Sequence, residues 1–357
     1  MNTYLLKITT VLLLVSSCNS YDMDPAQQQM DIDMSDFFVY TETPSDLLSK
    51  TTASKTDKRS CYTMLNLNRL LDENPGLEKR MYAIEYQTRK FMASKKPSGT
   101  PGSGPPGSNQ DPTPEPSIPY DGTVYIPVVV NIIEKYNNEV SDAQITSQID
   151  ILNEDFNNAN SNTAGVPDVF KNLVANYNIQ FRRAAVNRIV SSKNSWGTRD
   201  AMKSSKKGGI DATDPSHNLN IWVCEIGGGI LGYAQFPGGP EQTDGVVIGT
   251  DYFGETTGPY GDGRTATHEI GHWLNLRHIW GDGGCSVDDF VEDTPVSNGP
   301  NYGCPGETIN CGSIDMTMNY MDYVYDDCMY MFTIDQNTRS RALFASDGYR
   351  SSFVTSN

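Results

Sequence analysis

The sequence predicts a mixed α/β domain over residues 119–357, the larger part of the 357-residue chain. Three observations lead to this fold class. Four runs rich in β-branched residues have the length of strands, and apolar residues recur at helical spacing between them. A proline- and glycine-rich linker, residues 97–118, separates this part from everything upstream. Alternating strands and helices favour a layered α/β architecture.

The elements of this domain are predicted in chain order. Residues 123–133 form a strand in which Pro127 indicates an edge position or a bulge. Ser141 and Gln144 form a capping-box pattern before a helix with a periodic apolar stripe. The remaining predicted elements are strands at 178–186, 219–226 and 244–249, a helix from about Arg264 to Leu274, and a last helix capped by Thr333 with Gln336.

The upstream part, residues 19–96, is predicted to contain little independent structure. Residues 19 to about 60 are polar and poor in aliphatic side chains, so we expect them to be disordered or loosely held. Residues 61–96 indicate two short helices separated at Asn74-Pro75. This region is too small for a core of its own, so it must pack against something else.

The first 18 residues read as an export signal. Lys7 precedes a short apolar stretch, residues 8–15, which is too brief to span a bilayer. The following residues, up to Cys18, resemble a bacterial lipobox, in which the cysteine becomes lipidated. The alternative is an ordinary signal peptide with an incidental cysteine. Either way we expect an exported protein, and any membrane attachment would be through the lipid.

The composition excludes several classes of partner. A net charge of −17 argues against binding to nucleic acid or other phosphates, and no basic patch or phosphate-cradling glycine loop is present in the sequence.

The most specific motif is HEIGHWLNLRH, residues 268–278. His268 and His272 are four residues apart, so on a helix both imidazoles project from one face and can share a zinc ion. His278 supplies a third ligand, and three protein ligands leave a position open for a water, as in a catalytic zinc site. Glu269 is placed to activate that water. The alternative is a set of surface histidines on an amphipathic helix.

This motif, with the flanking GHWLNLRHIWGDGGC, resembles the pappalysin family of metzincin zinc metalloproteases. The resemblance implies a twisted, mainly parallel sheet, an active-site helix, a loop-rich lower subdomain and a C-terminal helix, preceded by a small pro-segment. The family has a glycine where this chain has Asn275, and asparagine is the residue that most readily replaces glycine in a left-handed turn.

The resemblance also implies roles for residues beyond the motif. Met321 matches the methionine in the turn beneath the zinc, and Tyr323 matches a catalytic tyrosine, although both could be ordinary packed residues. Asp326 matches the acid at the base of the family's specificity pocket, which implies a preference for arginine or lysine after the scissile bond; a solvated acid is the alternative. Residues 227–239, with Gly229 and Leu231, resemble the substrate-binding edge strand.

The cysteines divide into groups. Cys285, Cys304, Cys311 and Cys328 cluster after the zinc motif, as expected for disulfides in an oxidising compartment, and four cysteines allow three pairings. The family pattern implies Cys285–Cys311 and Cys304–Cys328. Cys224 lies in a predicted strand and is expected to be a buried, inert thiol.

An acidic loop, residues 285–295, indicates a structural calcium site, since calcium prefers hard oxygen ligands. The family binds calcium in the matching loop, which implies Asp289, Thr294 and the Val291 carbonyl as ligands. A solvated acidic loop is the alternative.

Cys61 is the candidate for a latency device. The segment around it resembles the pro-segment of pappalysin zymogens, whose lone cysteine coordinates the zinc and displaces the catalytic water. A thiolate is a good fourth ligand for zinc. The family often has a glycine where Tyr62 follows here, and the alternative is an unpaired structural thiol.

These observations predict an exported zinc endopeptidase that acts on proteins or peptides and is made as a latent zymogen. The domains expected are residues 1–18 as signal, 19–96 as pro-segment, 97–118 as linker and 119–357 as catalytic domain. The alternative hypothesis is a catalytically silent, calcium-stabilised surface protein that binds a partner through the same cleft.

Overall fold

The computed structural model describes residues 32–41, 61–95 and 117–355. The signal-like segment with Cys18 and nearly all of the predicted linker lie outside these residues. Within the described residues, one sheet has the strand order β2-β1-β3-β5-β4. β2, β1, β3 and β5 are parallel, and β4 pairs with β5 antiparallel at the edge. The strands are β1 (Val124–Glu134), β2 (Ile179–Val190), β3 (Leu219–Cys224), β4 (Gly232–Ala234) and β5 (Val246–Gly249).

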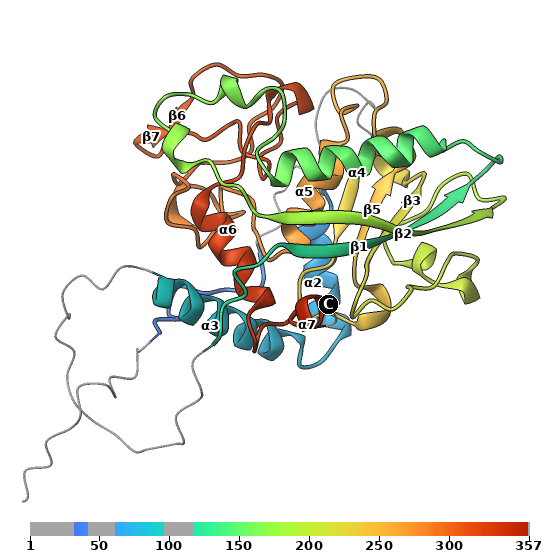
Figure 1. Cartoon of the computed structure of the whole chain (residues 1–357), viewed down its shortest axis with the longest axis horizontal. Helices are drawn as coiled ribbons and strands as arrows, with labels where there is room; N and C mark the ends of the chain where they lie inside the picture. Colours follow the sequence, from blue (N-terminus) through green and yellow to red (C-terminus); the bar gives the residue numbers. More distant parts are fainter. Residues whose placement is uncertain (1–31, 42–60, 96–116, 356–357) are drawn as a thin grey trace, which may run out of the picture.

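Helices cover the sheet and extend below it (Figure 1). α4 runs along the sheet beside β2 and also packs on α5, while α3 lies below α6. A small hairpin, β6 (Ile309–Asn310) with β7 (Ser313–Ile314), belongs to the loop-rich part after α5. The helices are α2 (Thr63–Glu73), α3 (Leu77–Lys95), α4 (Asp142–Phe156), α5 (Arg264–Trp273), α6 (Ile334–Arg341) and α7 (Ser352–Thr355). This mainly parallel α/β arrangement confirms the predicted fold class.

The placement of Pro127 was half right in the sequence-based prediction. β1 is not an edge strand, because β2 and β3 flank it on either side. A bulge is present, however: the β1–β2 register shifts between Val128 and Val129. Pairing with β3 begins only at Val128, so on that side Pro127 lies outside the ladder and its missing N–H breaks no bond there.

The two predicted helix caps behave differently. Thr333 and Gln336 form the complete reciprocal capping box at the start of α6. At α4, Ser141 accepts the Gln144 N–H, but the Gln144 side chain reaches the carbonyls of Thr250 and Phe253 instead of its own N-cap. The α4 cap therefore also ties the helix to the loop after β5.

The N-terminal region, of which residues 32–41 and 61–95 are described, packs on the rest of the chain through those residues, as its small size required. α2 packs along β4, and α3 packs against α6. Residues 32–41 were expected to be disordered or loosely held, and that prediction is wrong for them: the rings of Phe37 and Phe38 pack on Phe290, and Arg277 donates a hydrogen bond to the Phe38 carbonyl. The prediction rested on the mean composition of residues 19–60, which is polar and does not reveal the apolar contacts that two aromatic side chains can make.

Among the described residues, no helix is both long enough and apolar enough to cross a membrane.

Candidate metal centre

The helix α5 carries the first part of the histidine motif and ends in a turn that reverses the chain. The Asn275 N–H donates to the His272 carbonyl at 2.9 Å, and the Leu276 N–H donates to the Gly271 carbonyl at 3.0 Å. These are the two bonds of a Schellman motif, and Asn275 occupies its left-handed position with a φ of 72°. Asparagine thus takes the conformation expected of it, and the turn brings His278 back towards the helix.

The three histidines point their Nε2 atoms at one another. Their Nδ1 atoms lie 2.6–2.8 Å from oxygen acceptors, which fixes each ring, and the Nε2 atoms of His272 and His278 are 3.1 Å apart. Trp280 stacks on His278 with ring centroids 4.4 Å apart. The Nδ1 acceptors are the Tyr320 carbonyl for His268, the Leu276 carbonyl for His272 and the Asp282 carboxylate for His278. Such outer partners orient ligands around a metal.

Cys61 of the N-terminal region completes this cluster. Its Sγ is 3.6 Å from His272 Nε2, and the ligand atoms of Cys61 and the three histidines all lie within 4.8 Å of one another. All four side chains are buried. Burial, with the nearby Glu269 carboxylate, raises the pKa of the Cys61 thiol well above its usual value, and burial lowers the pKa of His272 well below its own. Three imidazoles and one thiol are a donor set that suits tetrahedral zinc.

Glu269 is engaged by the same N-terminal segment. The Thr63 hydroxyl donates to Glu269 Oε2 at 2.7 Å, and the Cys61 thiol lies 3.5 Å from the same oxygen. The segment therefore contacts both the metal-ligating atoms and the carboxylate beside them.

The edge strand β4 is covered by this segment too. Cys61 forms a parallel bridge with Gly232, and the Tyr62 N–H donates to the Gly232 carbonyl at 3.1 Å. The Ala234 N–H donates to Thr63 Oγ1 at 2.7 Å, and the Asn66 side chain donates to the Ala234 carbonyl at 2.9 Å. The outward main-chain groups that a substrate strand would use are thus occupied.

Gly229 and Leu231, the two residues predicted to bind substrate, both precede β4 and occupy different environments. Gly229 is in the turn that precedes the strand, with a φ of 72°. The Leu231 side chain is buried, and its carbonyl accepts the Gly249 N–H at 2.8 Å, so that carbonyl faces the sheet. The groups that meet the N-terminal region belong to Gly232 and Ala234.

Met321 and Tyr323 lie next to the cluster, where the family resemblance places them. Met321 is fully buried against α5, and a Cβ on Gly271 would overlap the Met321 sulfur, so the motif needs glycine at that position. The Tyr323 ring lies 5.0 Å from the His278 ring, centroid to centroid. Burial raises the pKa of Tyr323 well above its usual value, so its hydroxyl keeps its proton.

Asp326 is 1% exposed, which rules out the alternative of a solvated acid. Its Oδ2 accepts the backbone N–H groups of Asp262 and Arg264 at 3.1 and 3.2 Å, at the start of α5. Burial, a hydrogen bond with Asp327 and the charge of Asp326 together raise the pKa of Asp262 to about 6. Three carboxyl groups therefore gather at this end of the helix.

The acidic loop brings together the three predicted calcium ligands. Thr294 Oγ1 lies 2.9 Å from Asp289 Oδ1 and 2.9 Å from the Val291 carbonyl. Burial and the neighbouring Asp288 raise the pKa of Asp289 well above its usual value.

The disulfides join Cys285 to Cys311 and Cys304 to Cys328, the pairing that the resemblance implies. Cys224 is a fully buried free thiol whose pKa is raised by burial.

Two residues of the centre, Thr63 and Asp282, were missed in the sequence analysis. Thr63 reaches Glu269 from a helix that is 206 positions away in the chain, so no local pattern marks it. Asp282 could have been noticed, because it stands four residues after His278 and carboxylates often support ligating histidines.

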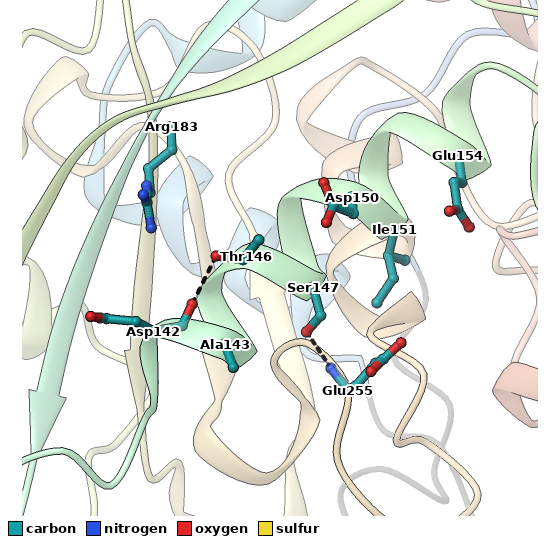
Figure 2. Close-up of a pocket in the computed structure, with 9 residues that line it drawn as sticks. All are labelled: Asp142, Ala143, Thr146, Ser147, Asp150, Ile151, Glu154, Arg183 and Glu255. Carbon is teal, nitrogen blue, oxygen red and sulfur yellow. Dashed lines mark hydrogen bonds between the residues drawn. The ribbon is translucent and has the colours of Figure 1, made fainter.

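A separate hollow of about 640 Å³ lies along the exposed face of α4, away from the histidines (Figure 2). Figure 2 shows Asp142, Asp150, Glu154 and Glu255 around it, with Arg183 opposite. At the metal cluster, by contrast, Cys61 and Thr63 of the N-terminal segment lie directly against Glu269 and the histidines.

Comparison with known proteins agrees with this geometry. Residues 206–345 match the profile of the family described as pregnancy-associated plasma protein-A. An extracellular metalloprotease 1 of Coccidioides posadasii is 34% identical over 240 residues, which are 63% of this chain and 77% of that protein.

Two solved structures share the fold. Mature mirolysin of Tannerella forsythia, in complex with a cleaved peptide, is 44% identical with a TM-score of 0.64, over 66% of this chain and 96% of that one. A promirolysin mutant from the same organism is 38% identical with a TM-score of 0.70, over 83% of this chain and 97% of that one. The added coverage indicates that a pro-segment precedes the catalytic part in both chains. The chain therefore belongs to the pappalysin family of metzincin metalloproteases and is a metalloendopeptidase.

Proposed function

We propose that the chain is a latent zinc endopeptidase, in which His268, His272 and His278 hold the catalytic zinc and Cys61 occupies its fourth position. The observation that carries this proposal is the buried set of four ligand atoms within 4.8 Å of one another. In this reading residues 19–96 are the pro-segment, 97–118 the linker and 119–357 the catalytic domain.

The chemistry of hydrolysis would be divided between the metal and two side chains. Zinc, when bound, would lower the pKa of a water and stabilise negative charge on the substrate oxygen. Glu269 would accept the proton of the attacking water and pass it to the leaving amine. Tyr323, with its proton retained, would donate a hydrogen bond to the substrate oxygen as charge develops there.

Latency would come from one segment acting on two groups. Cys61 would fill the position that water needs, and the Thr63 hydroxyl holds the Glu269 carboxylate at 2.7 Å. Activation would require a cut between α3 and the catalytic domain. Arg89 is a poor site for that cut, because it lies within α3 and pairs both with Glu85 of the same helix and with Asp36 of the segment 32–41. The exposed end of α3 at Lys95 supports cleavage at Lys95-Lys96 instead.

The preference for arginine or lysine after the scissile bond is proposed to rest on Asp326. The support is electrostatic: three carboxyl groups lie together and favour a cation, and burial together with the two neighbouring carboxyl groups raises the pKa of Asp262. Asp326→Asn should reduce cleavage before basic residues relative to cleavage before neutral ones.

The remaining assignments are a calcium ion held by Asp289, Val291 and Thr294, and export with lipid attachment at Cys18. The cluster of oxygens in the 289–294 loop supports calcium. A calcium-dependent rise in melting temperature that Asp289→Asn removes would test it.

The central test measures zinc and cleavage together. The full chain, after proteolytic activation, should contain one zinc and cleave a mixed peptide library, with cuts concentrated before arginine and lysine. Glu269→Ala should keep the zinc and lose about 10²–10⁴-fold in turnover, since a general base contributes that much. Loss of zinc in Glu269→Ala would contradict its assignment as base rather than ligand.

The latency test uses Cys61→Ala, which should self-process faster than the parent chain. Cys224→Ala is the matched control, because that thiol is also buried but lies away from the cluster. Equal processing rates in all three proteins would remove the switch.

A further inference from the structure

Asp200 forms a second acidic position beside the edge strand, separate from Asp326. Its carboxylate is 7% exposed, and its backbone has a φ of 54°, a left-handed conformation. Asp200 Oδ1 accepts the Tyr233 hydroxyl at 3.1 Å and lies 3.2 Å from Lys203 Nζ. Tyr233 belongs to β4, so the carboxylate is fixed to the strand that the N-terminal segment covers.

The other carboxylate oxygen, Oδ2, pairs with the guanidinium of Arg69 from α2. Arg69 lies one helical turn after Asn66, whose side chain binds the Ala234 carbonyl, and the two side chains are hydrogen-bonded. A basic side chain of the pro-segment thus lies on Asp200 while the same segment holds the main chain of β4.

Removal of the pro-segment would take this guanidinium away. Burial opposes ionisation of Asp200, but Lys203 and Arg69 together hold its pKa below the usual value. Without Arg69, this nearly buried carboxylate would keep one cation, Lys203, at Oδ1 and would lose the cation that pairs with Oδ2. A substrate cation placed there would restore the lost pairing.

We propose that Asp200 is a specificity residue, which binds an arginine or lysine of the substrate on the amino-terminal side of the scissile bond. The pro-segment runs parallel to β4, with Cys61 opposite Gly232 and Asn66 near Ala234. A substrate strand added antiparallel to β4 would run the opposite way, so Asp200 would face residues before the bond. This inference rests on the proposed endopeptidase function, and Arg69 marks the position that the substrate side chain takes.

The first test uses only the activated wild-type chain. Two peptide series, identical except for arginine or its neutral isostere citrulline at each position, are compared by kcat/KM. At one position before the scissile bond, arginine should be about tenfold better than citrulline, as expected for a charge-assisted pair. Equal values at every position before the bond, with a normal preference after it, would overturn this inference alone. An absence of cleavage would overturn the proposed function and this inference with it.

The second test assigns the preference to Asp200. Asp200→Asn should remove the arginine preference before the bond and retain the preference after it, whereas Asp326→Asn should show the reverse. Arg199→Gln is the matched control, because Arg199 is adjacent in sequence but pairs with Glu73 at the surface. A preference before the bond that survives in Asp200→Asn would overturn the assignment.

Discussion

Two of the contacts between the N-terminal region and the histidine motif differ in their physical character. At the metal cluster, Cys61 and Thr63 offer one sulfur and one hydroxyl to buried polar groups. The second contact lies at the turn that follows α5. There, Glu85 of α3 forms a buried ion pair with Arg339 of α6, and Arg339 also donates to the Asn275 carbonyl at 2.8 Å. The first contact involves Glu269 and the histidine cluster themselves. The second involves the turn that positions His278.

This difference teaches how latency and docking are separated. In the proposed latent form, two small groups, the Cys61 thiol and the Thr63 hydroxyl, would block the chemistry. The Glu85–Arg339 pair is deeply buried, with 2% and 1% exposure, so leaving either partner alone would strand a charge. We infer that the N-terminal contact inhibits and that the α3 contact holds the inhibitor in place.

The largest effect should come from breaking the α3 contact. Glu85→Ala leaves Arg339 buried without its carboxylate, so the unprocessed chain should lose about 3 kcal/mol of unfolding free energy. Urea unfolding in a Glu269→Ala background, which prevents self-cleavage, measures this loss. Glu78→Ala, on the exposed face of the same helix, should change little. If both variants lose the same amount, the ion pair does not anchor the pro-segment.

The next effect should come from disturbing the packing of Met321 against Gly271 of α5. In Gly271→Ala the added methyl would overlap the Met321 sulfur, so we expect a loss of about 2 kcal/mol from overpacking, and weaker zinc retention. Gly299→Ala, where a Cβ would meet no atom within 4 Å, serves as the control in thermal melts. Full stability in Gly271→Ala would mean that the floor beneath α5 is loosely packed.

A smaller effect should follow from weakening the support of one ligand. Asp282→Asn keeps the shape and tolerates the φ of 65° at this position, but it replaces the carboxylate that lies 2.6 Å from His278 Nδ1. Zinc affinity should fall about tenfold to a hundredfold, as measured by competition with a chelator. Asp150→Asn, an exposed acid on α4, is the control. An unaltered affinity would show that Trp280 stacking alone orients His278.

The smallest effect is expected at Asn275, which lies between the two contacts. Asn275→Ala must place an alanine at a φ of 72°, at a cost of about 1 kcal/mol, whereas Asn275→Gly should be close to neutral. Equal melting temperatures for these two variants would argue that the side-chain contact with Thr88, not the backbone conformation, makes asparagine suitable here.

Local sequence patterns predicted the helices and strands well. They failed where the structure of a segment depends on a partner far away in the sequence. Residue types within α5, and the capping box of α6, were enough to place these two helices. Pro127 left an edge position and a bulge both open, because strand order depends on which segments pair and not on one residue; the structure shows the bulge. Residues 32–41 were expected to be loose, because their order comes from Phe290, about 250 positions away.

The sequence by itself determined the histidine cluster and the turn, because the three histidines and Asn275 lie within eleven residues and are related geometrically by a single helix end. Only the tertiary structure decided what faces that set. Cys61 lies over two hundred positions from His272, and Arg69 lies 131 positions from Asp200, so the sheet edge and the packing of α2 bring them together. Residues that are close in the sequence are held in a fixed geometry by the backbone between them. Residues that are far apart in the sequence come into contact only when the core forms.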